Sequence, residues 1–267
     1  MKKNIFIFCI TLLSSSLTAY GIISWSNQEK NKIVSSCGMQ NSAEAVDSRY
    51  GKEDTVEDLV YDVDSRFMHT ITMEELNKAK TIFDIYPKKA AITVDSYESV
   101  LVSTVNSESE IKEFGFNEIL NKGQLELIKS FDYSTNFYVQ ADYLIKNEKT
   151  GEMSREYIVY YITIVPEQEA VYIDGKNALI SYLKNGTSDK TSIIKRDKLK
   201  SGQVSFTVSK EGKIKNVELW STSGYPTVDE ELLKTVTNIP GKWVPATNSK
   251  GEKVDQEFVF FFGLQGC

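Results

Sequence analysis

Residues 202–239 carry the pattern that most restricts the fold of this chain. Three apolar residues alternate with more polar ones, as in a strand with one buried face: Val204, Phe206 and Val208. The sequence SKEG predicts a turn, and a second alternating segment predicts the other strand of a hairpin. A helix follows, with Thr227 and Glu230 as its expected capping box, and ends before Pro240. Strand, strand and helix in this order favour an antiparallel sheet with helices on one face.

The segments on either side extend this pattern over residues 167–267. DGKNALISYLKNG predicts a short helix, with Asp174 near its start and Gly186 just past its end. Residues 256–264 predict a final strand that contains FVFFF, five consecutive apolar residues. We therefore expect an α+β domain in residues 167–267.

Residues 58–166 predict a separate, mainly β domain with a sandwich-like arrangement. A capping box of Thr72 and Glu75 begins a helix that ends at Tyr86-Pro87. Residues 90–105 are rich in β-branched residues, and residues 136–165 predict a long hairpin with its turn at Lys149-Thr150-Gly151. The polar sequence PEQEA marks the expected boundary with the second domain.

The first 25 residues predict export. MKKNIFIFCITLLSSSLTAYGIISW has two lysines and no further charge before Glu29. An uncharged helix of about 22 residues spans a hydrocarbon core of about 30 Å, so residues 4–25 suit a membrane anchor. The small residues Ala19 and Gly21 equally suit a cleaved signal peptide. Either alternative places the later residues on the periplasmic side of the inner membrane, with the polar residues 26–57 as a linker.

Composition argues against several other classes of protein. The 267 residues carry a net charge of −6, whereas a general nucleic-acid binder needs a basic face. Three scattered cysteines and the single histidine, His69, do not suit a zinc site. We expect no cofactor and no metal. Cys37 and Cys267 either form a disulfide in an oxidising compartment or remain free thiols.

The motifs of the C-terminal hundred residues resemble a known family. They occur in one order: Gly202, Val204, Phe206, Val208, Glu211-Gly212, Asn216-Val217, Ser223-Gly224, Asp229, Leu232-Leu233, Trp243-Val244-Pro245-Ala246, Gly251 and Phe258–Phe262. This order is similar to the C-terminal domain of TonB-family energy transducers, in the form common in Bacteroidetes-type bacteria. Three usual features of that family are missing: a long proline-rich spacer, a Ser–His pair in the anchor, and the proline of an aromatic-Pro-Gly motif before the first helix. Residues 58–166 are more weakly similar to the β-rich modules of the gliding-motility and secretion protein GldM.

The resemblance implies an exported binding protein and not an enzyme. Its partner would be an outer-membrane transporter or another envelope protein, captured by β-strand addition. A role in energy-coupled transport is the narrower implication of the resemblance. We expect the added strand to lie beside the last strand, at Gln256, Phe258, Val259, Phe260, Phe261 and Phe262. The alternatives are a structural component of an envelope secretion or motility assembly, and an exported hydrolase. No nucleophile elbow, His-Glu-x-x-His motif or glycine-rich loop occurs in the sequence to favour the hydrolase.

Overall fold

The structure is a computed structural model that describes residues 59–86, 94–105, 110–191, 193–195 and 197–264. The expected anchor or signal peptide, the linker and all three cysteines lie outside these ranges. The described strands form one sheet of five strands, one of four and two short pairs. Helices and antiparallel strand pairs occur together, so the α+β class is confirmed.

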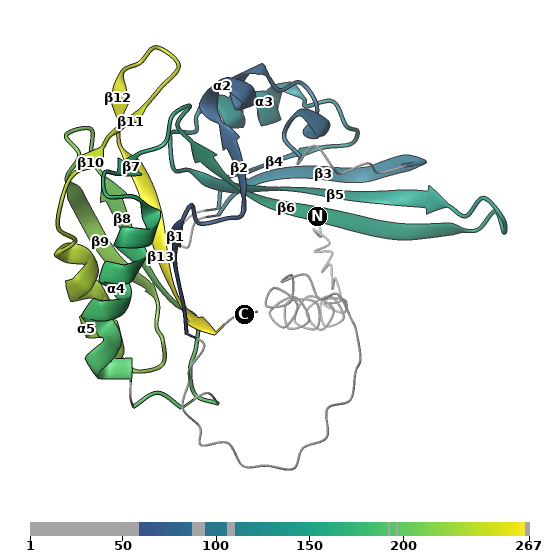
Figure 1. The fold of residues 1–267 in the computed structure, drawn as a ribbon. Coiled ribbons are helices and arrows are strands. Elements are labelled where there is room, and N and C mark those ends of the chain that lie inside the picture. Colours follow the sequence, from purple (N-terminus) through teal and green to yellow (C-terminus); the bar gives the residue numbers. More distant parts are fainter. Residues whose placement is uncertain (1–58, 87–93, 106–109, 192, 196, 265–267) are drawn as a thin grey trace, which may run out of the picture. The chain divides into compact units, whose positions relative to one another are not determined.

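The five-stranded sheet has the order β2-β6-β5-β3-β4 (Figure 1). Its strands are β2 (His69–Thr72), β3 (Ser96–Thr104), β4 (Lys112–Gly115), β5 (Asn136–Lys146) and β6 (Met153–Val165). β5 and β6 form the predicted hairpin, and the alternation along β5 buries Phe137, Val139, Ala141 and Tyr143. All pairs are antiparallel except β2 with β6.

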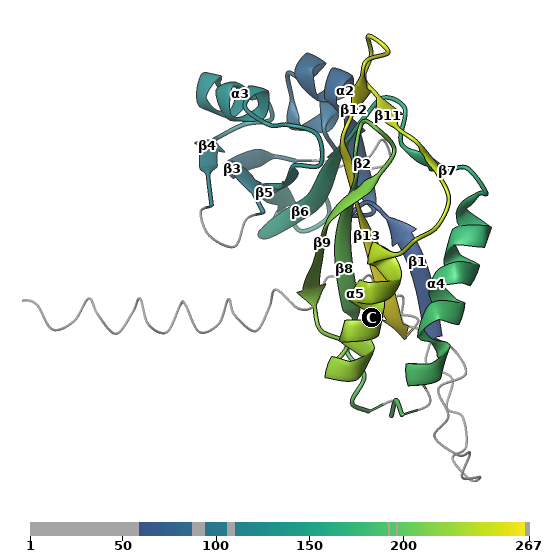
Figure 2. The same cartoon turned by 90° about the vertical axis from the view of Figure 1, so that its left-hand side faces the viewer.

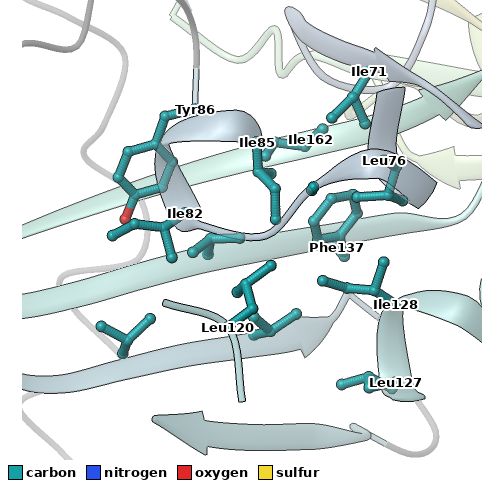
Figure 3. Close-up of a cluster of buried hydrophobic side chains, with 14 of the residues drawn as sticks. Ile71, Leu76, Ile82, Ile85, Tyr86, Leu120, Leu127, Ile128, Phe137 and Ile162 are labelled. Atoms are coloured by element: carbon teal, nitrogen blue, oxygen red, sulfur yellow. The ribbon is translucent and has the colours of Figure 1, made fainter. Parts of the chain in front are cut away.

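Helical segments cover the buried face of this sheet. They are α2 (Met73–Lys78), the 3₁₀ turn η1 (Ile82–Asp84) and α3 (Lys122–Lys129). Leu76, Ile82 and Ile128 from these segments meet Phe137 of β5 in one apolar core (Figure 3). The expected sandwich is therefore not found among the described residues, because helices occupy the face that a second sheet would cover. The predicted capping box of Thr72 and Glu75 is confirmed, but the helix ends at Lys78 instead of continuing to Tyr86.

The four-stranded sheet has the order β1-β13-β8-β9 (Figures 1 and 2). Its strands are β1 (Leu59–Asp64), β8 (Gly202–Val208), β9 (Ile214–Ser221) and β13 (Gln256–Leu264). β8 and β9 are the predicted hairpin, and β13 is the predicted last strand. β1 lies in this sheet and not in the five-stranded one, although the sequence assigned its residues to the first domain.

Two helices pack on one face of the four-stranded sheet, α4 (Lys176–Thr191) and α5 (Pro226–Thr237). The short strands β7 (Val171–Tyr172), β10 (Trp243–Val244), β11 (Ala246–Thr247) and β12 (Lys253–Val254) pair as β10-β7 and β11-β12. The predicted capping box of α5 is wrong, since the helix begins at Pro226 without a side-chain cap on Tyr225. Asp229 instead accepts a hydrogen bond from the Ser223 amide over 2.8 Å, which joins the first turn of α5 to the end of β9.

Candidate functional site

β13, which carries the residues predicted to bind a partner, has a hydrogen-bonded neighbour on each side. β8 pairs with it from Gln256 opposite Val208 to Phe262 opposite Gly202. β1 pairs with its other side, from Val259 opposite Asp64 to Leu264 opposite Leu59. The position expected for a partner strand is therefore filled by residues 59–64 of the same chain.

The side chains of the six predicted residues mostly face the interior. Phe258, Phe260 and Phe262 belong to the core under α4 and α5, and Val259 on the other face is fully buried. Gln256 accepts a hydrogen bond from the Ala170 amide over 2.7 Å and donates one to Glu169 over 2.6 Å. Phe261 is half-buried. The apolar run FVFFF is thus explained by burial on both faces of the strand, and what β13 can offer to another strand is its main chain.

Two hydrogen bonds show which way the main chain points at this edge. The Val63 amide donates to Oδ1 of its neighbour Asp62 over 2.8 Å, so this amide points away from β13. The Glu257 amide donates to Oγ of Ser134 over 2.8 Å, so it points away from β8. Amide direction alternates along an antiparallel strand, and the amides of Val259, Phe261 and Gly263 therefore face β1. These are the donors that any strand beside β13 would use.

β1 is held by one apolar face and by a lysine at the start of α4. Tyr61 contacts Phe260 and Phe262, with ring centroids 6.2 and 5.3 Å apart. Lys176 Nζ lies 2.9 Å from Oδ1 of Asp62 and 3.4 Å from Oδ2 of Asp64. Partial burial opposes protonation of Lys176, but the two carboxylates outweigh it and raise its pKa. The side chains of this ion pair are all about half exposed, so it contributes little to stability.

The opposite face of the sheet carries a partly buried group of charges beside the end of β1. Burial raises the pKa of Glu257 to about 7; the positive charge of Arg66 opposes this shift and the negative charge of Glu218 adds to it. Arg66 follows β1 by two residues, and its guanidinium lies 4.6 Å from the ring centroid of Trp220 on β9. Burial lowers the pKa of Arg66. The chain leaving β1 is thereby joined to β9 across the face of the sheet.

β9 forms the other edge of the four-stranded sheet, and its geometry is less suited to receiving a strand. Its pairing with β8 shifts register twice, and Asn216 within it has a positive φ of 51°. Its flank carries Lys215, which binds Asp255 over 2.6 Å. Bulges and charges of this kind protect natural sheet edges from further pairing. The six pairs between β1 and β13, by contrast, run without a register shift.

Sequence reasoning missed the residues of β1 and Lys176 as parts of this site. A signal was present, because Leu59, Tyr61 and Val63 alternate with more polar positions at Asp62 and Asp64. His69 packs its ring against Tyr160, with centroids 5.2 Å apart. Within the described ranges no group of three or more His, Cys, Asp or Glu side chains is placed to hold a metal ion. In the same part of the chain no helix has the length and apolarity needed to cross a membrane.

Comparison with known proteins identifies one region of the chain. Residues 201–264 match the family model described as Gram-negative bacterial TonB protein C-terminal. This range runs from the start of β8 to the end of β13 and leaves β1 and α4 outside. The match supports the TonB C-terminal domain expected from the motifs. No curated protein and no solved structure matches the chain. The similarity of residues 58–166 to GldM modules stays a prediction.

Proposed function

We propose that this chain is an exported, non-enzymatic, TonB-like protein of the periplasm that binds an envelope partner by β-strand addition. The observation that carries the proposal is the match of residues 201–264 to the TonB C-terminal family. This range contains the antiparallel strands β8, β9 and β13 and the helix α5, which packs on them. Strand addition draws its affinity from main-chain hydrogen bonds, so it needs no special side chains. β13 fits this mode of binding, because most of its side chains are buried in the core.

The proposed site is the side of β13 that now pairs with β1, along residues 256–264. The pairing there is regular, the amides of Val259, Phe261 and Gly263 face it, and the other edge of the sheet is bulged. The proposed partner is an outer-membrane transporter or another envelope protein. The protein would be held at the inner membrane through residues 4–25 or released after signal cleavage. In its most specific form, the proposal is that the protein takes part in energy-coupled transport.

Site-specific photo-crosslinking in the intact envelope tests this function. A photoreactive residue at Phe261, which is half-buried beside the proposed strand position, should form an adduct with an envelope protein. The same residue at Glu230 is the matched control, because Glu230 is exposed on α5, which packs on the sheet through its apolar face. An adduct of equal yield at both positions, or none at Phe261 in a folded protein, would contradict the proposal.

A further inference from the structure

We propose that β1 is an exchangeable strand that occupies the partner site within its own chain, and that a partner strand binds by replacing it. The proposal rests on the function proposed above and specifies how its site is reached. Its first support is geometric. β1 lies in register on six residues of β13 and uses the main-chain positions that an added strand needs.

β1 is held less firmly than the strand on the other side of β13. Of its six residues only Val63 is buried, at 6% exposure, while Asp64 is exposed and the others are half-buried. β8 buries five of its seven residues and pairs with β13 over seven positions. The ion pairs of Lys176 with β1 are solvent-exposed and therefore weak. If one neighbour of β13 leaves while the rest of the sheet stays folded, it is β1.

The match to the TonB family also sets β1 apart from the other strands of the four-stranded sheet. The family model begins at residue 201 and so accounts for β8, β9, α5 and β13 without β1. β1 reaches this sheet from more than a hundred residues earlier in the sequence, and in the chain it follows the segment predicted as a linker. The strand thus lies outside the part of the sheet that the family match covers.

The contacts of β1 define the chemistry of the strand that would replace it. Leu59, Tyr61 and Val63 pack on the core of the sheet, and Asp62 and Asp64 face Lys176. A replacing segment should be extended, with aliphatic or aromatic residues at alternate positions and an acidic residue near Lys176. An alternating pattern of this kind would keep the buried face of the sheet covered during exchange.

A peptide with the sequence of residues 58–65, DLVYDVDS, labelled with a fluorophore, tests the exchange without any envelope partner. In the wild-type full chain β1 competes with it at an effective concentration on the order of millimolar. Val63→Asp should loosen β1 and increase peptide affinity at least tenfold, measured by fluorescence anisotropy. A peptide with the same valine-to-aspartate change, and a scrambled one, should not bind.

A second variant shows whether a change in peptide binding comes from the loosening of β1 or from a folding defect. Asp62→Pro removes an amide that faces β13 and leaves the apolar face of β1 unchanged. Near-ultraviolet circular dichroism must first show that the remaining fold is intact. If neither folded variant binds the peptide better than the wild type does, β1 is not exchangeable.

Cross-strand disulfides connect the exchange to the proposed function. With the native cysteines replaced by serine, Asp64→Cys with Val259→Cys locks β1 onto β13, since opposed residues lie about 5.5 Å apart at Cα, and position 261 stays free for the photoreactive residue. The matched control, Ser205→Cys with Val259→Cys, locks β13 to β8 from the same cysteine. Oxidation should abolish partner crosslinking in the first pair only.

The outcomes of the two experiments separate the two proposals. Peptide exchange without any envelope adduct would contradict the proposed function and leave the exchange of β1 standing. An adduct formed equally by both oxidised pairs would retain the function and overturn the exchange.

Discussion

Val63→Ala tests whether β1 packs on the four-stranded sheet as it does in the structure. The side chain of Val63 is 6% exposed and belongs to the core of the four-stranded sheet. Removing two buried methyl groups, at about 0.8 kcal/mol each, and leaving a small cavity should lower the free energy of unfolding by about 2 kcal/mol. Val60 lies on the opposite face of the same strand and is half-buried, so Val60→Ala should lower it by less than about 1 kcal/mol.

Denaturation by guanidinium chloride, followed by tryptophan fluorescence, measures both variants. Trp220 lies on β9 and Trp243 in the core of this sheet, so two of the three tryptophans report on this part of the protein. The midpoint should fall for Val63→Ala with little change in the slope of the free energy against denaturant. Equal and small losses for both variants would show that β1 does not contribute to this core.

Val63→Asp extends the test to the exchange of β1. An aspartate held in the core would cost several kcal/mol, because a buried charge without a partner is strongly disfavoured. If β1 can detach, the loss is limited to the free energy that holds the strand in place. Val63→Asp and Asp62→Pro should then cost about the same, although they disturb the strand in different ways. A much larger loss for Val63→Asp would contradict independent detachment of β1.

Three further predictions concern other parts of the chain. Gly212 and Gly251 have similar positive φ values of 73° and 75°, but a Cβ at Gly212 would clash with the Trp243 carbonyl oxygen, whereas a Cβ at Gly251 would meet nothing within 4 Å. Denaturation should therefore show Gly212→Ala to be less stable than Gly251→Ala by about 1–2 kcal/mol. The pKa of Glu257 is raised to about 7, so the folded state holds this proton more tightly and the wild type should lose stability relative to Glu257→Gln as pH rises from about 5 to about 8. A difference between the two proteins that is constant with pH would contradict that assignment. A reporter enzyme fused after residue 60 should be active only outside the cytoplasm, and activity confined to the cytoplasm would contradict export.

The elements that the sequence predicted are those whose signals are local. The hairpins β5–β6 and β8–β9 follow from alternation along each strand and a turn between them. The capping box of α2 follows from Thr72 and Glu75, three residues apart. Each of these features is specified by neighbouring residues, so a single sequence is enough to find it.

The end of α4 shows how tertiary packing can replace a local signal. Gly186 was expected just past the end of the helix, as glycines often are, but α4 continues through it to Thr191. A Cβ at Gly186 would lie 2.6 Å from Cγ2 of Thr235, which is on α5. The glycine therefore allows the two helices to approach closely, and nothing in the sequence near residue 186 indicates which residue lies opposite.

The position of β1 shows the larger limit of sequence reasoning. The alternation of residues 59–64 predicts a strand, but it does not say which sheet the strand joins. Chain order placed it with the residues that follow, whereas the structure pairs it with a strand about two hundred residues later. Such a pairing depends on matching faces and free main-chain donors on both strands, and the sequence of one strand carries only half of that information.

A strand of the same chain beside β13 has two opposing effects: it covers an edge that could aggregate, and it occupies the site proposed for the partner. An open edge beside FVFFF would be a template for pairing between copies of the protein, which natural sheets avoid by covering or blunting their edges. β1 provides this cover, and under the exchange proposed above it also lowers the affinity for a partner strand. If β1 were detached in about 1% of molecules, a partner strand would bind about 100-fold more weakly than to an open site, a difference of about 2.7 kcal/mol. Loosening β1 should therefore increase partner affinity and self-association together, because both depend on the same row of amides on β13.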